Sequence, residues 1–282
     1  METQTGHQIP VKTTTETTNL GELFTDGPES IAKLFTELKL KSMGQSLTTD
    51  WEKMTNEERR TLFKYLLPWI ATQKSERQSA LIAARINAAK FRRIQTIEMF
   101  DFKHSKITEK IEKTYLTLHQ SLDRHHLPSA IFTGNAGVGK THLARALGYA
   151  ACQKGIRVLF LTAGEMVNNL SHAHKAFNLE IELNKYRRPD VLIIDELGYV
   201  SLDTQASNLF FQVISARHDA NLGTIATTNL PFGKFNQIFA NDAIAHAIVD
   251  RLVNEAEVFY MEGESYREHQ RKEKTRTRNQ SS

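Results

Sequence analysis

The chain has 282 residues, of which 40% are hydrophobic and 24% charged, a composition typical of soluble globular proteins and long enough for two domains. The formal net charge of +4 permits a nucleic-acid partner without requiring one. No apolar run could span a bilayer and no signal-peptide pattern opens the chain, so we expect no membrane partner. The single cysteine, Cys152, excludes an intrachain disulfide and favours a cytoplasmic location.

The first third of the chain predicts helices. Residues 1–29 are polar and threonine-rich, which indicates a disordered tail. Over residues 30–94 apolar side chains recur at helical spacing without a strand pattern, so we predict a small all-helical domain that binds DNA or a partner. Ser30 is the expected first N-cap. Residues 55–58 form a capping-box pattern, and Pro68 should kink or restart the helix that follows.

Basic residues gather at the end of this helical domain. Arg85 and Arg92 are seven residues apart and fall on one helical stripe, with Lys90 and Arg93 close by. Such a cluster is either a face that contacts DNA phosphates or a solvated basic surface, and both interpretations remain open.

Residues 95–265 alternate strand and helix patterns, which predicts an α/β domain with a parallel sheet flanked by helices. The expected helices cover 107–122, 142–150, 164–188, 202–218 and 242–254. The expected strands cover 129–133, 156–161, 190–196, 224–229 and 258–261. Residues 266–282 are basic, and we expect a flexible tail that touches DNA.

The sequence Gly-Asn-Ala-Gly-Val-Gly-Lys-Thr at 134–141 fits the phosphate-loop pattern G-x-x-x-x-G-K-[ST]. Its glycines let backbone N–H groups curl around phosphate oxygens, and the helix that follows adds the positive end of its dipole. Lys140 is placed to reach the β- and γ-phosphates of ATP, and Thr141 to ligate Mg²⁺. The predicted nucleotide contacts are Gly134, Asn135, Ala136, Gly137, Val138, Gly139, Lys140, Thr141 and His142.

Two carboxylates follow a run of four apolar residues that predicts a strand buried on both faces. Asp195 is expected to hold Mg²⁺ directly or through water, and Glu196 to polarise the attacking water. We expect this strand to lie next to the strand that enters the loop. Asn229 would orient water if the strand 224–229 lies beside the acidic strand; the alternative is a turn asparagine before Pro231.

Further basic residues are candidates for DNA or for a second subunit. Lys175, Lys185, Arg187 and Arg188 form another basic group, with the same two interpretations as the first. Arg251 is a candidate arginine finger that would reach the γ-phosphate of a neighbouring subunit; the alternative is a surface salt bridge. Arg217 is the weaker candidate for a finger.

With these residues placed, the chain resembles the IstB-like ATPases, the transposition helper proteins of insertion sequences. These belong to the AAA+ group of P-loop NTPases and are related to DnaC-type helicase loaders. The resemblance covers about residues 31–268. Its motifs are Gly-Lys-Thr-His-Leu-Ala at 139–144, Asp-Glu-Leu-Gly-Tyr at 195–199, Thr-Thr-Asn at 227–229, Asp-Arg-Leu at 250–252 and Gly-Glu-Ser-Tyr-Arg at 263–267. The Phe-Asp-Phe sequence at 100–102 is also typical.

The resemblance implies an ATPase that oligomerises on double-stranded DNA, with ATP and Mg²⁺ at its subunit interfaces. DNA would stimulate hydrolysis, and the protein would recruit or stimulate a transposase. Lys140, Glu196, Asn229 and Arg251 would be the catalytic residues, and Thr141 and Asp195 the metal ligands. The alternative, a replicative helicase loader that uses ATP as a switch, has the same nucleotide site. The helical N-terminal domain and Asp-Glu-Leu-Gly-Tyr favour the transposition helper.

Overall fold

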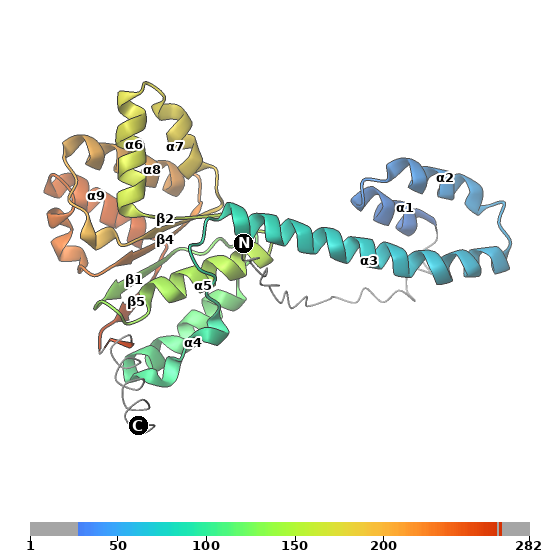
Figure 1. Cartoon of the computed structure of the whole chain (residues 1–282), viewed down its shortest axis with the longest axis horizontal. Helices are drawn as coiled ribbons and strands as arrows, with labels where there is room; N and C mark the ends of the chain where they lie inside the picture. The colour runs from blue at the N-terminus through green and yellow to red at the C-terminus, as the bar shows by residue number, and fades with distance from the viewer. Residues whose placement is uncertain (1–27, 264, 267–282) are drawn as a thin grey trace, which may run out of the picture. The chain divides into compact units, whose positions relative to one another are not determined.

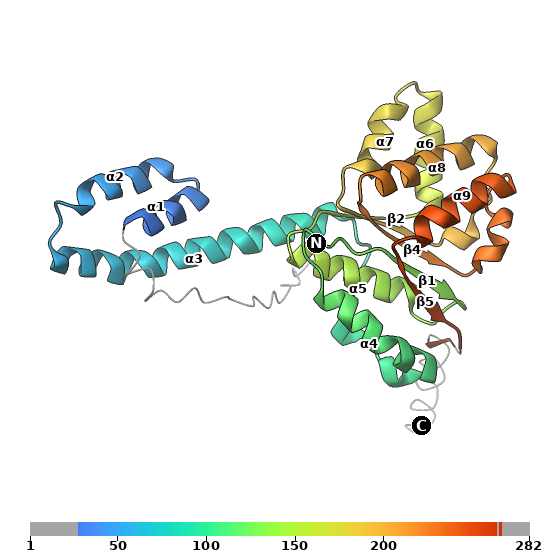
Figure 2. The same ribbon diagram turned by 180° about the vertical axis from the view of Figure 1, so that it is seen from behind.

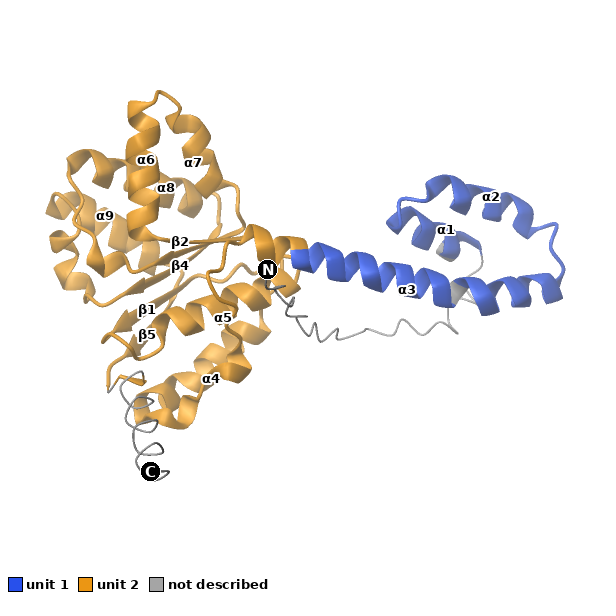
Figure 3. Cartoon of the chain, viewed as in Figure 1, with its two compact units in different colours: residues 1–83 blue, residues 84–282 orange. Residues whose placement is uncertain are grey.

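The structure is a computed structural model that describes residues 28–263, 265 and 266. The predicted polar tail, 1–29, lies outside the described residues except for its last two positions. The predicted basic tail, 266–282, lies outside them except for Tyr266. The chain divides into two compact units, unit 1 up to Ala83 and unit 2 from Ala84 onward (Figure 3).

Unit 1 is helical over its described residues (Figure 1). It contains α1 (Pro28–Glu37), α2 (Lys41–Trp51) and most of α3 (Asn56–Ala88). Apolar side chains of α1, of α3 and of the turn after α1 form its core, in which Ile31, Phe35, Leu38, Phe63 and Ile70 are buried. The predicted N-cap at Ser30 is wrong, because α1 already begins at Pro28, and a proline suits the first turn of a helix.

The start of α3 carries the predicted capping box. The Glu58 carboxylate accepts from the backbone N–H of Thr55 at 2.7 Å, and the Thr55 hydroxyl accepts from the Glu58 N–H at 3.2 Å. The helix does not restart at Pro68 but continues as one element of 33 residues. Proline removes a single donor from the helix, while Phe63 and Ile70 anchor both sides of Pro68 in the core of unit 1.

Unit 2 is built on a parallel sheet, as predicted. Its strands are β1 (Ala130–Gly134), β2 (Val158–Thr162), β3 (Val191–Asp195), β4 (Gly223–Thr228) and β5 (Glu257–Met261). The strand order within the described residues is β2-β3-β4-β1-β5. The acidic strand β3 therefore pairs with β4 and not with the loop strand β1. The prediction that β1 and β3 are neighbours is wrong, because β4 pairs with both.

Helices cover both faces of the sheet. α4 (Lys106–Gln120) and α5 (Lys140–Gln153) lie on one face, while α6 (Ala163–Lys175), α8 (Thr204–Asp219) and α9 (Asp242–Val253) lie on the other (Figures 1 and 2). α7 (Leu179–Arg187) packs on α6 and α8. Short 3-10 helices are η2 (Ile97–Met99), η3 (Phe102–His104), η4 (Leu197–Tyr199) and η5 (Phe232–Gln237). The helix predicted over 164–188 is two helices, because Phe177 has a left-handed backbone with φ 56° that ends α6.

The strand β3 is buried at every position, as its apolar run predicts. α5 crosses the sheet from β1 over β4 to β3 and β2, so its first turn lies near the carboxyl ends of several strands. This crossing brings the phosphate-loop motif toward the acidic strand although β4 separates them. No helix in the described part of the chain is apolar enough over a sufficient length to cross a bilayer.

Candidate functional site

The loop at 134–141 joins β1 to α5 at the carboxyl end of the sheet. Gly137 has φ 81° and Gly139 has φ 101°, backbone conformations that suit glycine. Gly139 is the N-cap of α5, and no side chain caps the first turn of this helix. Its N–H groups and the positive end of its dipole are therefore presented at the loop, which fits an anionic ligand.

The Lys140 side chain folds back over this loop. Its ammonium group donates to the carbonyl oxygen of Gly134 at 2.8 Å and to that of Asn135 at 2.5 Å. A cation is thus held directly at the glycine-rich turn. This is where a phosphate cradled by the loop would be neutralised.

Thr141 and Asp195 meet at the end of the sheet. The Thr141 hydroxyl donates to Oδ1 of Asp195 at 2.8 Å, and the Thr227 hydroxyl donates to the same oxygen at 2.6 Å. Asp195 is only 2% exposed, so these hydroxyls compensate the burial of its charge. A hydroxyl beside a carboxylate is an oxygen-only ligand set, which Mg²⁺ prefers. The residues present therefore fit the predicted metal.

Arg145, which is not among the predicted site residues, also contacts this centre. Its Nη2 lies 3.8 Å from Oδ2 of Asp195. Its guanidinium carbon lies over the Phe160 ring, 4.6 Å from the ring centre. Burial lowers the pKa of Arg145, and the Asp195 charge opposes this shift. A sequence signal existed, because residue 145 is four positions after Thr141 and so shares its helix face.

Glu196 follows Asp195 with a left-handed backbone, φ 62°, a conformation that costs a residue with a side chain about 1–2 kcal/mol. Its N–H donates to the Thr227 hydroxyl at 3.0 Å. The side chain is exposed and, among the described residues, its carboxylate accepts no hydrogen bond. A carboxylate that is open to water next to a metal-type ligand is suited to act as a base.

Asn229 lies directly after β4, which pairs with β3, so the condition for its predicted role is met. Its Oδ1 is buried and has no hydrogen-bond partner within the described chain. A Cβ at position 198 would collide with this oxygen, so Gly198 leaves room for it. A buried acceptor without a partner is rare in proteins and fits a position that a water or ligand fills.

Two segments outside the predicted nucleotide contacts also contact the loop. The His142 ring makes hydrogen bonds with the Gln95 amide at 3.0 Å and the Thr96 carbonyl at 2.9 Å, and burial lowers its pKa. Only the main chain of His142 is then available for the predicted nucleotide contact. After β5 the chain returns to the loop, where the Tyr266 N–H donates to the Gly137 carbonyl at 3.1 Å.

Arg251 lies at the other end of the sheet. It contacts the Ala247 carbonyl at 3.1 Å and stacks over the Phe211 ring at 4.9 Å. It lines a small cavity with Ser129 and Thr224, which stand at the amino ends of β1 and β4. The loop is at the carboxyl end, so Arg251 does not reach the phosphate site of its own chain. Its role toward a neighbouring subunit stays a prediction.

Arg217 is not a finger, contrary to the weaker of the two predictions. Its side chain is fully buried and donates to the carbonyls of Tyr186, Pro189, Asp190 and Gly223. Burial lowers its pKa to about 9, so the guanidinium is still charged at neutral pH. Arg217 ties the segment before β3 to the start of β4.

Replacing Arg217 by methionine should therefore destabilise the protein by about 3 kcal/mol or more, because several buried carbonyls lose their donor. Urea titration of the free energy of unfolding measures this. The matched control is Arg157→Met at the same end of β3, where the arginine is 65% exposed and pairs with Asp190. This change should cost at most about 1 kcal/mol. Equal losses in the two variants would contradict the assignment.

The two basic groups predicted to contact DNA approach each other at α6 and α7, where Arg92 and Lys90 of the first group interact with Glu165 and Glu182. Arg92 pairs with Glu165 at 2.7 Å, Lys185 with Glu182 at 2.5 Å and Arg187 with Glu180 at 2.8 Å. Burial raises the pKa of the Glu182 carboxyl, but Lys185, Tyr186 and Lys90 lower it more, so that the pKa lies below its usual value. In the described chain Arg93, Lys175 and Arg188 are exposed and form no ion pair, whereas Arg85 is half-buried.

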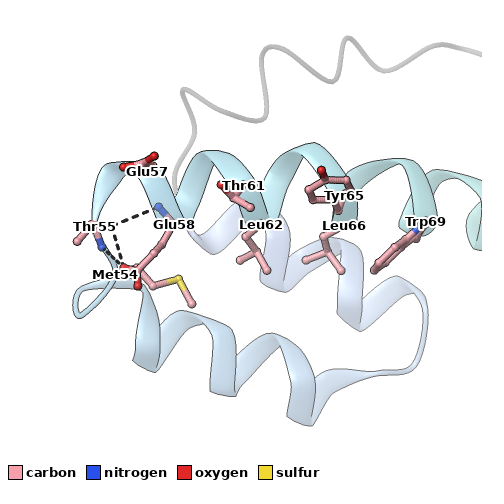
Figure 4. A pocket seen from close by; sticks show the side chains of 9 residues that line it. All are labelled: Met54, Thr55, Glu57, Glu58, Thr61, Leu62, Tyr65, Leu66 and Trp69. Carbon is pink, nitrogen blue, oxygen red and sulfur yellow. Dashed lines mark hydrogen bonds between the residues drawn. The ribbon is translucent and has the colours of Figure 1, made fainter.

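Unit 1 contains a separate hollow of about 750 Å³ (Figure 4). Leu62, Leu66 and Trp69 line it along α3, with Met54 and Thr55 at one end. Trp69 is 68% exposed. Because its lining is mainly apolar, this hollow does not suit the phosphates of a nucleotide.

The comparisons with known proteins agree with this geometry. The family described as "IstB-like ATP binding protein" matches residues 33–274. The insertion sequence IS5376 putative ATP-binding protein of Geobacillus stearothermophilus is 35% identical over 205 residues, 72% of this chain and 80% of that protein. The insertion sequence IS21 putative ATP-binding protein of Pseudomonas aeruginosa is 29% identical over 235 residues, 83% and 87% of the respective chains.

Solved structures show the fold. The DnaI crystal structure matches with a TM-score of 0.52 at 19% identity, covering 61% of this chain and 89% of that one. AMPPCP-bound DnaA from Aquifex aeolicus matches with a TM-score of 0.50 at 18% identity, covering 59% and 50%. The predicted AAA+ P-loop fold, with a parallel sheet flanked by helices, is thereby confirmed.

Proposed function

We propose that this chain, which belongs to the family of IstB-like ATP-binding proteins, is a DNA-stimulated ATPase that assists a transposase at target DNA. The observation that carries the ATPase assignment is the 2.8 Å hydrogen bond between Thr141 and Asp195. It joins the phosphate loop to the acidic strand at one point. A shared Mg²⁺–ATP site requires this proximity.

In this proposal the loop N–H groups and Lys140 hold the phosphates of ATP, and Thr141 and Asp195 hold Mg²⁺. The bound metal supplies positive charge that stabilises the negative charge on the phosphate oxygens. Glu196 takes a proton from the attacking water, whose oxygen bonds to the γ-phosphorus as the bond to ADP breaks. Asn229, with its buried and unpartnered oxygen, orients that water.

Arg251 acts in this scheme on the nucleotide of a neighbouring subunit. Its place at the amino ends of β1 and β4 supports a role in trans, because the phosphate loop of its own chain lies at the opposite end of the sheet. A homo-oligomer with ATP at its subunit interfaces follows from this role. An arginine finger stabilises charge that develops on the phosphates during transfer.

DNA contacts are assigned to the basic surface of unit 2. The interaction of Arg92 and Lys90 with carboxylates of α6 and α7, close to the second basic group, supports this. Arg93, Lys175 and Arg188 are exposed and have no ion-pair partner among the described residues. Exposed cations that are not neutralised by neighbours are suited to phosphate contacts. Arg92, Lys185 and Arg187 already pair with carboxylates, so we expect smaller contributions from them.

The partner is proposed to be a transposase, because the similar proteins are named as insertion-sequence products. A replicative helicase loader would have the same nucleotide site, and DnaI is similar to this chain in fold alone. Affinity capture with this chain as bait separates the two. Capture of a transposase supports the proposal, and capture of a hexameric helicase supports the alternative.

ATP turnover measured with and without duplex DNA, together with sizing of the complex, tests the proposed function. We expect DNA to raise turnover, and DNA affinity to fall steeply with salt. Lys175→Ala should make the fall of log affinity with log salt less steep, with the magnitude of the slope smaller by about 1. The matched control is Lys110→Ala, an exposed lysine on α4, which covers the other face of the sheet. A flat salt response and unchanged turnover would contradict the DNA assignment.

A further inference from the structure

We propose that Thr227 is a positioning residue that holds Asp195 and Glu196 in their working arrangement. This inference rests on the proposed ATPase function and adds a residue to it. Thr227 lies on β4, the strand that pairs with both β1 and β3. Its side chain is 2% exposed, so its hydroxyl must find partners inside the protein.

The hydroxyl makes two hydrogen bonds of opposite direction. It donates to Oδ1 of Asp195 at 2.6 Å and accepts from the backbone N–H of Glu196 at 3.0 Å. A threonine hydroxyl has one hydrogen to donate and lone pairs to accept, so both bonds form together. A single side chain of β4 therefore joins the two adjacent residues that carry the carboxylates of the site.

The bond to Glu196 fixes an unusual turn of the backbone. Glu196 has φ 62°, in the left-handed region that residues with a Cβ rarely adopt. β3 ends one residue earlier, at Asp195, so the ladder does not hold the Glu196 N–H. Without the Thr227 acceptor this backbone would relax, and the proposed base would move relative to Asp195.

The bond to Asp195 has a different consequence. Oδ1 of Asp195 accepts from Thr141 and from Thr227. The Thr141 hydroxyl belongs to the phosphate loop, whereas the Thr227 hydroxyl belongs to the sheet. The sheet-borne bond keeps the carboxylate oriented when the loop residues engage a ligand. Groups that orient metal ligands in this way change metal affinity or activity by about 10- to 100-fold when they are removed.

The test compares Thr227→Val, which keeps the shape and removes the hydroxyl, with Thr227→Ser, which keeps the hydroxyl. Amide hydrogen exchange at Glu196, resolved by NMR on the full chain without nucleotide, should be at least about 10-fold faster in the valine variant. The kcat for ATP should fall by about 10- to 100-fold while KM changes by less than about 3-fold. The serine variant should stay close to wild type in all three quantities.

The control for loss of a buried hydroxyl is Ser207→Ala in α8. Ser207 is fully buried and makes two hydrogen bonds, to Leu202 and Ala240. The Ser207→Ala substitution should leave amide exchange at Glu196 and the kcat for ATP unchanged. If Thr227→Val does not fold, Thr227→Ala removes the same hydroxyl without placing a methyl group against the Asp195 carboxylate.

Unchanged exchange or unchanged kcat in the valine variant would overturn the proposal, and so would a serine variant as impaired as valine. A wild-type chain that hydrolyses no ATP would instead refute the proposed function. The exchange measurement would still decide whether Thr227 holds the Glu196 backbone.

Discussion

Glu196→Gln should lower ATP turnover by about 100- to 10,000-fold, because glutamine cannot take a proton from the attacking water. ATP binding should persist, since the phosphate loop and the Thr141–Asp195 contact are unchanged. Glutamate and glutamine have the same shape, so the left-handed backbone at position 196 strains both equally and the fold should be kept. Steady-state turnover and equilibrium binding of a fluorescent ATP analogue measure the two effects separately.

The matched control is Glu257→Gln. Glu257 is exposed and begins β5 at the amino end of the sheet, opposite the loop, so its loss should leave turnover at the wild-type level. Normal turnover in Glu196→Gln would place the base elsewhere. A loss of ATP binding in the same variant would show that Glu196 serves binding and not the chemical step.

Lys140→Ala should weaken ATP binding by about 100-fold or more. The ammonium group is held against the carbonyls of Gly134 and Asn135, and its hydrogen bonds to phosphate would be charge-assisted, each contributing about 1.5–3 kcal/mol. Isothermal titration with ATP and Mg²⁺ measures the change. Lys154→Ala is the control, because Lys154 caps the other end of the same helix and should leave affinity unchanged. Tight ATP binding by Lys140→Ala would refute the loop assignment.

The sequence predicts the phosphate loop and the acidic strand because both are local patterns. The glycines of the loop fix a turn, and the apolar run before Asp195 fixes a buried strand, without reference to distant residues. The capping box at Thr55 is equally local and is confirmed. The nearness of Thr141 to Asp195 depends on the fold. A parallel sheet places both residues at its carboxyl edge, and the crossing of α5 over β4 then brings them into contact.

Long-range pairing decides what the sequence could not predict. Periodicity does not say which strand pairs with which, so it does not predict that β4 lies between β1 and β3. The same strand order makes Thr227 a neighbour of both carboxylates. A helix pattern does not show that Arg217 is buried. Its burial follows from the packing of α8 against the segments before β3 and at the start of β4, whose carbonyl oxygens accept its hydrogen bonds.

The ATP dissociation constant, measured with and without Mg²⁺ in wild-type and Asp195→Asn protein, tests most directly whether residues 134–141 and 195 share one metal–nucleotide site. We expect Mg²⁺ to strengthen ATP binding by about 10-fold or more in the wild type and to have almost no effect in the variant. An equal effect of Mg²⁺ on both proteins would contradict a shared site.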